Sequence, residues 1–370
     1  MCFNQSTQAN EPNLGHLVME VLHDPNKVHF VGSIGLDSVE EVFATLGASL
    51  GRRLRRVPDG EPGGRSLWIS WQYPLLRAQH FLKPDTTRPN PTTGFFPLGL
   101  AENIAAGDVR FGELGYAREA RASYQDFLAA RSAGKLTGDT KFQVSLPTPF
   151  AVIFPMCLPK DEPFIETAYE RAMLKEVETI CRAIPHRDLC IQWDICIEMI
   201  LWDGRSTHIR NPFANLQAAI IQRMQSLSRA VPKDVELGFH LCYGDWEAKH
   251  FIEPEDAGKL VEMANTLAEH VDRPITYFHM PVPANRSDDS YFKPLTALQL
   301  SSKTELYLGL VHADGVENTR KRISVASIYV SDFGIATECG IARSRSPALV
   351  KEIIKIYAEV SREPLMQASA

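Results

Sequence analysis

The sequence predicts an α/β protein of the (β/α)8 TIM barrel class, with a long irregular insertion near its N-terminal third. Short β-rich runs alternate with long amphipathic runs over most of the 370 residues. Eight β-rich runs can be counted, the number that closes a barrel of parallel strands. The runs are apolar almost throughout, which is typical of strands covered on both faces. The competing architecture is an open doubly wound sheet, but no glycine-rich dinucleotide fingerprint follows any of the runs.

The predicted strands and helices follow one another along the chain. The strands are expected at residues 28–34, 54–58, 141–149, 188–195, 235–242, 274–280, 305–311 and 332–338. The helical patterns lie at residues 36–51, 163–184, 213–231, 254–271, 315–330 and 346–363. Most of these helical patterns open with Pro, Asp, Asn or Ser and place Glu in the first turn, as helix starts do.

The length that a barrel does not need lies mainly in residues 59–135, where Pro and Gly are frequent and the pattern is irregular. We expect this segment to be a long connection over the barrel mouth. The predicted organisation is an N-terminal extension at 1–27, a single barrel domain at 28–363 that includes the inserted segment, and a tail at 364–370.

Composition narrows the class of function. The chain is 44% hydrophobic and 23% charged with a net charge of −6, and its one basic cluster, at residues 52–56, is too short to indicate a nucleic-acid surface. The seven cysteines are odd in number and have no framework spacing, which favours a reducing compartment over a disulfide scaffold. No signal-peptide pattern and no apolar run of about 18 residues is found. We therefore expect a cytoplasmic protein without nucleic-acid or membrane partners, which could form a homo-oligomer.

Thiol and imidazole groups at the ends of separate strands predict a metal site. His240 and Cys242 lie two residues apart in a predicted strand, so their side chains share one face. Cys339 ends the last predicted strand, and His279 ends the strand after the His-x-Cys pair. Because all strands of a barrel converge on one rim, these four side chains can surround one cation, and thiolate with imidazole favours Zn²⁺. Each has a simpler reading, since a lone strand His or Cys is commonly a core residue. Gly340 is expected to let the chain turn sharply after Cys339.

Further polar residues lie at or just beyond strand ends, where barrel enzymes place their working groups. His312 and Asp314 are candidates for acid catalysis of leaving-group departure, although Asp314 is equally a helix cap. Arg65 is expected to bind a substrate carboxylate, although the loop that holds it also has plain turn chemistry. The candidate substrate-binding residues are Ser33, Asp59, Glu61, Arg65, Trp68, Asp194 and Glu198, with Asp194 also a candidate catalytic residue.

The motifs GFHLCYGD, TECG and VGSI resemble the catalytic barrel of cobalamin-independent methionine synthase and its uroporphyrinogen-decarboxylase-like relatives, over roughly residues 28–360. The resemblance implies that His240, Cys242 and Cys339 bind zinc, and that Asp194 occupies the place of an acidic residue that binds the amino-acid substrate. The synthase has a glutamate ligand on the strand after His-x-Cys, where this chain has His279. A neutral imidazole there would leave the site one negative charge poorer.

Three classes of function follow from these residues. The first is zinc-dependent transfer of a methyl or other alkyl group between a small donor and a small thiol, with Asp194 and Glu198 orienting a cationic part of a substrate. The second is a metal-independent lyase or decarboxylase on the same barrel, with His279, His312 and carboxylates as acid-base groups. The third is a binding or regulatory barrel without catalysis.

Overall fold

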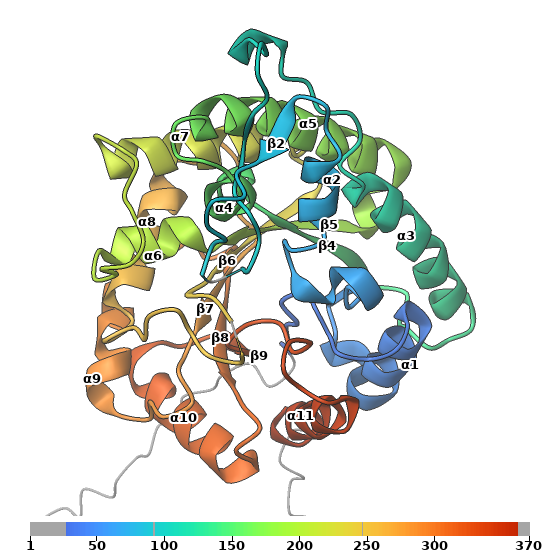
Figure 1. The fold of residues 1–370 in the computed structure, drawn as a ribbon. Coiled ribbons are helices and arrows are strands. Elements are labelled where there is room, and N and C mark those ends of the chain that lie inside the picture. The colour runs from blue at the N-terminus through green and yellow to red at the C-terminus, as the bar shows by residue number, and fades with distance from the viewer. Residues whose placement is uncertain (1–26, 92, 246, 362–370) are drawn as a thin grey trace, which may run out of the picture.

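The computed structural model describes residues 27–361, except residues 92 and 246. The predicted N-terminal extension and tail lie outside these residues, apart from Lys27. At the centre is a parallel sheet of seven strands that curls into a barrel with helices around it, so the predicted fold class is confirmed (Figure 1). In sheet order the strands are β1 (Arg56–Pro58), β4 (Lys141–Pro147), β5 (Leu189–Ile195), β6 (Glu236–Leu241), β7 (Tyr277–Pro281), β8 (Glu305–Val311) and β9 (Phe333–Thr337).

The eighth predicted strand, residues 28–34, closes the ring without forming a regular strand. Val28 bridges both Leu54, next to β1, and Ile335 of β9. Further along, the amide of Ile34 donates to the carbonyl of Gly60 at 2.8 Å. The segment therefore lies between β1 and β9, but its bridges are isolated because its backbone bonds alternate between two neighbours.

The outer wall consists of helices that follow the strands. Helix α1 packs against α3 and α11, and α10 also packs against α11, which joins the two ends of the wall. Ser38 caps α1 by accepting from the amide of Glu41 at 3.2 Å, and Asn215 caps α7 by accepting from the amide of Ala218 at 3.1 Å. The wall helices are α1 (Val39–Leu50), α3 (Tyr116–Ser132), α5 (Glu162–Ala183), α7 (Leu216–Arg229), α8 (Gly258–His270), α10 (Val316–Tyr329) and α11 (Pro347–Val360).

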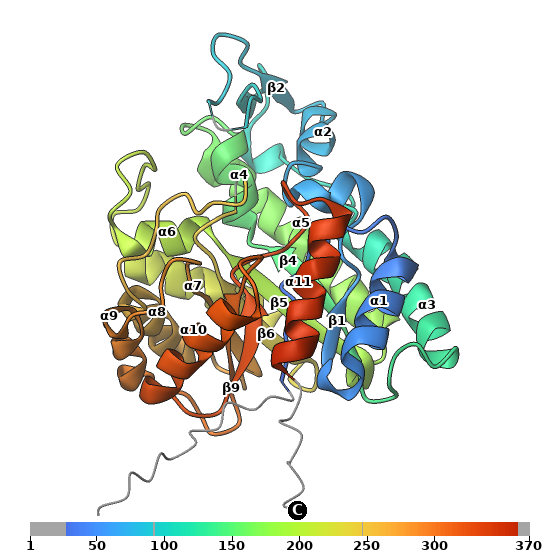
Figure 2. The same cartoon turned by 90° about the horizontal axis from the view of Figure 1, so that it is seen from below.

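Residues 59–135 are more regular than the sequence indicates, because α3 is one of the wall helices. The rest of the segment lies beside α4 at one end of the barrel (Figure 2). It is held there by hydrogen bonds such as that from the amide of Leu158 to the carbonyl of Leu98, at 2.8 Å. Its elements are η2 (Gly63–Leu67), α2 (Gln72–Arg77), the antiparallel strands β2 (Leu82–Pro84) and β3 (Leu98–Leu100), and η3 (Ala106–Asp108). Shorter elements elsewhere are η1 (Gly51–Arg53), α4 (Pro149–Met156), η4 (His186–Asp188), α6 (Ile197–Asp203), α9 (Asp289–Phe292) and η5 (Lys293–Ala297).

The amino ends of the strands are closed by charged side chains. The buried guanidinium of Arg56 in β1 pairs with Glu236 of β6 at 2.5 Å and with Glu305 of β8 at 2.7 Å. Tyr307 also contacts this guanidinium, at 3.2 Å. These side chains fill the interior of the barrel at the amino ends of the strands. Among the described helices, none combines the length and the apolar character that a membrane crossing requires.

Candidate metal centre and cavity

The register of the sheet brings two predicted ligands into one row. Asp194 of β5 pairs with His240 of β6, and His240 pairs with His279 of β7. Paired residues on adjacent parallel strands point to the same side of the sheet. The ring of His279 therefore lies beside that of His240, and their Nδ1 atoms are 2.7 Å apart.

His240, Cys242 and Cys339 form the group of side chains that could hold a metal ion. One ligand atom from each lies within 4.8 Å of the others, and all three residues are buried. The two sulfur atoms are 3.7 Å apart. Two thiolates bound at about 2.3 Å to one tetrahedral zinc would be about 3.8 Å apart, so the spacing fits the ion. Among the described residues, the predicted convergence of strands β6 and β9 on one point is thus observed.

His279 does not join this group of ligand atoms. Its Nδ1 contacts Nδ1 of His240, while Nε2 of His240 is buried and has no hydrogen-bond partner among the described residues. An imidazole whose Nδ1–H is held by a neighbour presents its free Nε2 to a metal, and such a neighbour fixes the tautomer. His279 is therefore placed to orient His240 rather than to act as the fourth predicted ligand.

Hydrogen-bond donors surround the two sulfur atoms. The amide of Gly244 donates to Sγ of Cys242 at 3.2 Å, and the guanidinium of Arg343 donates to Sγ of Cys339 at 3.4 Å. Contact with Cys196 raises the pKa of the Cys242 thiol, and contact with Cys242 raises the pKa of the Cys339 thiol. Thiols packed this closely resist ionising together unless a cation lies between them. Burial lowers the pKa of His240, which keeps its imidazole in the neutral form that binds metal.

Gly340 is required by a close approach and not by a sharp turn. A Cβ atom on this residue would lie 2.2 Å from Oγ of Ser33. The segment that closes the barrel therefore packs directly against the backbone that follows Cys339. Any larger residue at 340 would push Ser33 away from the site.

The ligand group lies in a cavity of about 620 Å³ at the carboxyl ends of the strands. Of the residues that the sequence predicts for the site, Ser33, Glu61, Trp68 and Asp194 line this cavity together with the ligand group. A cavity of this size accommodates a drug-sized molecule or two smaller ones. The ligand group is therefore accessible to small molecules that enter the cavity.

Two of the lining residues form an acidic group. Burial raises the pKa of Asp194 to about 7. Burial, together with Asp194 and Asp59, raises the pKa of Glu61 to about 8. Glu61 also has a left-handed backbone with φ 53°, a strained conformation that is typical of functional sites. Two carboxyl groups near each other in a cavity can accept one cation, such as an ammonium group.

Asp59, Arg65 and Glu198 are not part of the cavity lining. Arg65 donates to Asp59 at 2.8 Å and lies beside Glu119, so its guanidinium already has carboxylate partners. Ser123 also donates to Asp59, at 2.7 Å. Glu198 lies in α6 and is fully buried. Asp59 and Arg65 instead line a smaller neighbouring pocket that shares Glu61 and Trp68 with the cavity. Both carboxylate oxygens of Glu198 are buried without a hydrogen-bond partner among the described residues. A role for these three residues in substrate binding stays a prediction.

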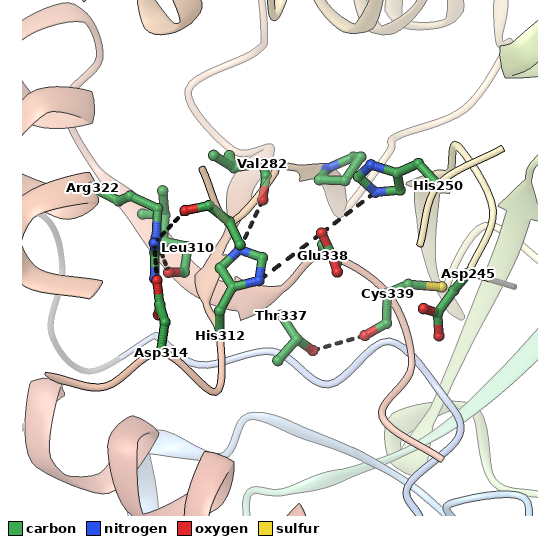
Figure 3. A network of polar contacts seen from close by, with 12 residues as sticks. Asp245, His250, Val282, Leu310, His312, Asp314, Arg322, Thr337, Glu338 and Cys339 are labelled. Atoms are coloured by element: carbon green, nitrogen blue, oxygen red, sulfur yellow. Dashed lines mark hydrogen bonds and ion pairs between the residues drawn. The ribbon is translucent and has the colours of Figure 1, made fainter. Parts of the chain in front are cut away.

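His312 and Asp314 are not among the residues that line the cavity. Figure 3 shows the polar contacts that they make instead. Nε2 of His312 is 2.9 Å from the carbonyl of Val282, and the carboxylate of Asp314 accepts two bonds of 2.7 Å from Arg322 of α10. Burial lowers the pKa of His312 to about 4, so the ring is neutral at pH 7 and a poor proton donor. Glu338 lies between His312 and His250, at 4.0 Å and 3.6 Å. These contacts leave the predicted acid role of His312 and Asp314 without support from the geometry, and it stays a prediction.

Among the lining residues that the sequence analysis did not name are Cys196, Asp245 and Arg343. Cys196 lies two residues after Asp194, the spacing that pairs His240 with Cys242, so the same argument would have found it. Asp245 and Arg343 pair at 3.2 Å across 98 positions of the chain. No sequence spacing indicates that pair, because it depends on how two loops fold onto each other.

Substitution of Glu61 is expected to change how stability depends on pH. A carboxyl group whose pKa is raised from 4.5 to about 8 in the folded state stabilises the fold below pH 4.5 and loses that contribution as pH rises to about 8. In metal-free protein, Glu61→Gln should therefore lose less stability than the wild type between pH 5 and pH 8. The expected difference is on the order of 1–2 kcal/mol, reduced from the full shift by water in the cavity.

Urea unfolding at the two pH values measures this difference. Glu178→Gln, which alters an exposed carboxylate of α5 paired with Arg182, is the matched control and should follow the wild type. Parallel pH profiles for wild type and Glu61→Gln would show that Glu61 ionises normally.

The fold and site together define a TIM-barrel protein with a buried cluster of His and Cys side chains at the carboxyl ends of its strands. Two solved structures share this fold. One is a B12-independent methionine synthase from Shewanella sp. W3-18-1 in complex with selenomethionine, with a TM-score of 0.58, 11% identity, and coverage of 92% of this chain and 97% of that one. The other, described as a vitamin-B12-independent methionine synthase from Listeria monocytogenes, has a TM-score of 0.54, 13% identity, and coverage of 90% and 96%.

The resemblance seen in the sequence motifs is thus confirmed at the level of the fold. No family model and no curated protein matches the chain.

Proposed function

We propose that the protein catalyses zinc-dependent transfer of a methyl or other alkyl group to or from a small thiol. The observation that carries the proposal is the buried group of His240, Cys242 and Cys339 at the floor of a large cavity. When bound there, zinc would hold the acceptor sulfur as a thiolate at neutral pH. The shared fold with methionine synthases supports the same class of reaction.

The residues of this chain would bind and orient the reactants. Glu61 and Asp194 would hold a cationic group of the acceptor, since both carboxyl groups line the cavity near the ligand group. Arg343 would limit the negative charge on Cys339 through its hydrogen bond of 3.4 Å. His279 would fix the ring of His240.

The transfer itself is a displacement in which no oxidation occurs. A bond forms between the acceptor sulfur and the alkyl carbon, while the bond from that carbon to the donor heteroatom breaks. The electron pair of the broken bond stays on the heteroatom. The thiol releases its proton when it binds, and the leaving group takes up a proton from water, so that charge and protons balance.

Metal analysis combined with a thiol titration tests the proposal. Protein purified without chelator is expected to contain zinc near one equivalent. After replacement of zinc by Co²⁺, added 2-aminoethanethiol should change the visible absorption, because a new sulfur ligand enters the ion's coordination shell. Zinc well below one equivalent, together with no recovery after zinc is added, would contradict the proposal and leave a lyase or a binding barrel.

The lyase alternative has no specific support from the geometry. It requires His279 and His312 to act on a substrate, but His279 contacts His240 and His312 contacts a backbone carbonyl outside the cavity lining. Burial lowers the pKa of His279 to about 3, and that of His312 to about 4. Neither ring is suited to donate a proton near pH 7.

A further inference from the structure

Large apolar side chains form part of the cavity wall. They come from elements far apart in the sequence: the η2 segment, α4, α6, and the loops that follow α6 and β6. Their convergence is therefore a property of the fold and not of one apolar run. The residues are Leu67, Trp68, Phe154, Ile197, Ile209 and Phe251.

Part of this apolar wall is open to solvent. Leu67 is 57% exposed and Phe251 is 40% exposed. They are two of the five large apolar side chains that stand out as exposed among the described residues, and both line this one cavity. An exposed apolar surface costs free energy in water unless a ligand covers it, so its concentration here indicates an apolar ligand.

The positive charges that line the cavity already have partners. Arg343 is held by Asp245, which also accepts from Arg345 at 3.0 Å. Arg210 pairs with Glu162 and lies over the ring of Phe154, 5.1 Å from its centroid. Among the described lining residues there is no lysine, and His208 is the remaining basic side chain apart from the ligand His240. An anionic ligand would find few free cations here, and the carboxyl groups of Glu61 and Asp194 offer it no positive charge.

From these observations we infer that the alkyl donor is an uncharged, apolar molecule, aliphatic or aromatic, whose body lies against this wall. The inference rests on the proposed alkyl transfer and names its donor class. Burial of an apolar body in the cavity supplies the binding free energy, while the carboxyl groups near the ligand group select the acceptor. The leaving atom of the donor is a heteroatom that departs with the electron pair of its bond to the alkyl carbon.

A homologous series of probes tests the donor class. Ethanethiol, propanethiol, butanethiol and pentanethiol are titrated into zinc-loaded protein, and Kd is measured by calorimetry. Each added methylene group should tighten binding about fourfold as long as it contacts the apolar wall. 4-Mercaptobutanoate should bind more weakly than butanethiol. Binding that does not change with chain length, or tighter binding of the carboxylate, would overturn the inference.

Single substitutions test whether the alkyl chains of the probes bind in the cavity. Phe251→Ser and Leu67→Ser should each reduce the gain per methylene, since they remove wall contacts. Phe164→Ser is the matched control, because Phe164 lies in α5, is 48% exposed, and does not line the cavity. An equal gain per methylene in all three variants would mean that the chains bind elsewhere.

The same series separates this inference from the proposed function. If ethanethiol changes the absorption of Co²⁺-loaded protein but longer thiols bind no better, alkyl transfer stands and the apolar donor is excluded. If zinc-loaded protein binds the thiols and the n-alkanols of equal length alike, with the same gain per methylene, the apolar site stands and the metal-dependent function fails.

Discussion

Cys339→Ser is expected to remove zinc and all thiol-dependent activity while the barrel stays folded. A serine hydroxyl does not ionise near neutral pH and is a poor zinc ligand, so the site keeps two of three protein ligands. We expect zinc affinity to fall more than about 100-fold. Substitution of a residue that only hydrogen-bonds to a ligand typically costs about 10- to 100-fold, and loss of a ligand should cost more. The measurement is metal content after dialysis against a buffered zinc concentration, with circular dichroism as the check on folding.

A cysteine outside the cavity provides the control for this change. Cys181 is also buried, but it lies in α5 and does not line the cavity. Cys181→Ser should keep the zinc of the wild type. Full retention of zinc in Cys339→Ser would show that the ligands are not those assigned.

Substitutions of His279 test whether this residue binds the metal itself or orients the ligand His240. His279→Phe removes the acceptor for Nδ1 of His240, and the expected loss in zinc affinity is about 10- to 100-fold. His279→Gln restores a hydrogen-bond acceptor and should recover part of that loss. If His279→Gln lost as much zinc affinity as Cys339→Ser, His279 would be a metal ligand.

Asp245→Asn is expected to destabilise the protein by about 3 kcal/mol. The side chain of Asp245 is 1% exposed and neutralises two partly buried guanidinium groups, those of Arg343 and Arg345. Removal of one partner from a buried ion pair leaves uncompensated charge, which typically costs 3–5 kcal/mol. Glu338, 3.8 Å from Arg345, offsets part of the loss and places the expected value at the lower end.

Urea denaturation followed by circular dichroism measures the loss. Glu178→Gln, in an exposed ion pair of α5, is the matched control and should change stability by about 0.5 kcal/mol or less. Asp245→Asn should also weaken zinc binding, because Arg343 donates to Cys339 and would lose its anchor. A loss below about 1 kcal/mol would mean that solvent or Glu338 compensates both arginines.

Residue patterns within single elements predicted much of this protein. Alternation of β-rich and helical runs located seven strands to within a few residues, because strand and helix periodicities are local properties. The shorter helices were missed, and α3 was hidden in a segment rich in Pro and Gly. The segment 28–34 was predicted as a strand, but its backbone bonds are divided between two neighbours.

The sequence also predicted part of the candidate site and missed the rest. His240 and Cys242 share a face because they lie two apart in one strand, and Cys339 joins them because parallel strands converge. His279 and His312 had equally suitable positions in the sequence, yet their rings point to other partners. A strand-end position fixes where a side chain begins but not which neighbour it contacts.

The sequence by itself determined the barrel and the three residues that could hold a metal, since both depend on spacing within strands and on their shared direction. Only the tertiary structure decided the orienting contact of His279, the ion pairs of Asp245 and the apolar wall of the cavity. These features join residues from separate loops and strands, and such contacts are set by strand register and loop packing, which no local pattern encodes.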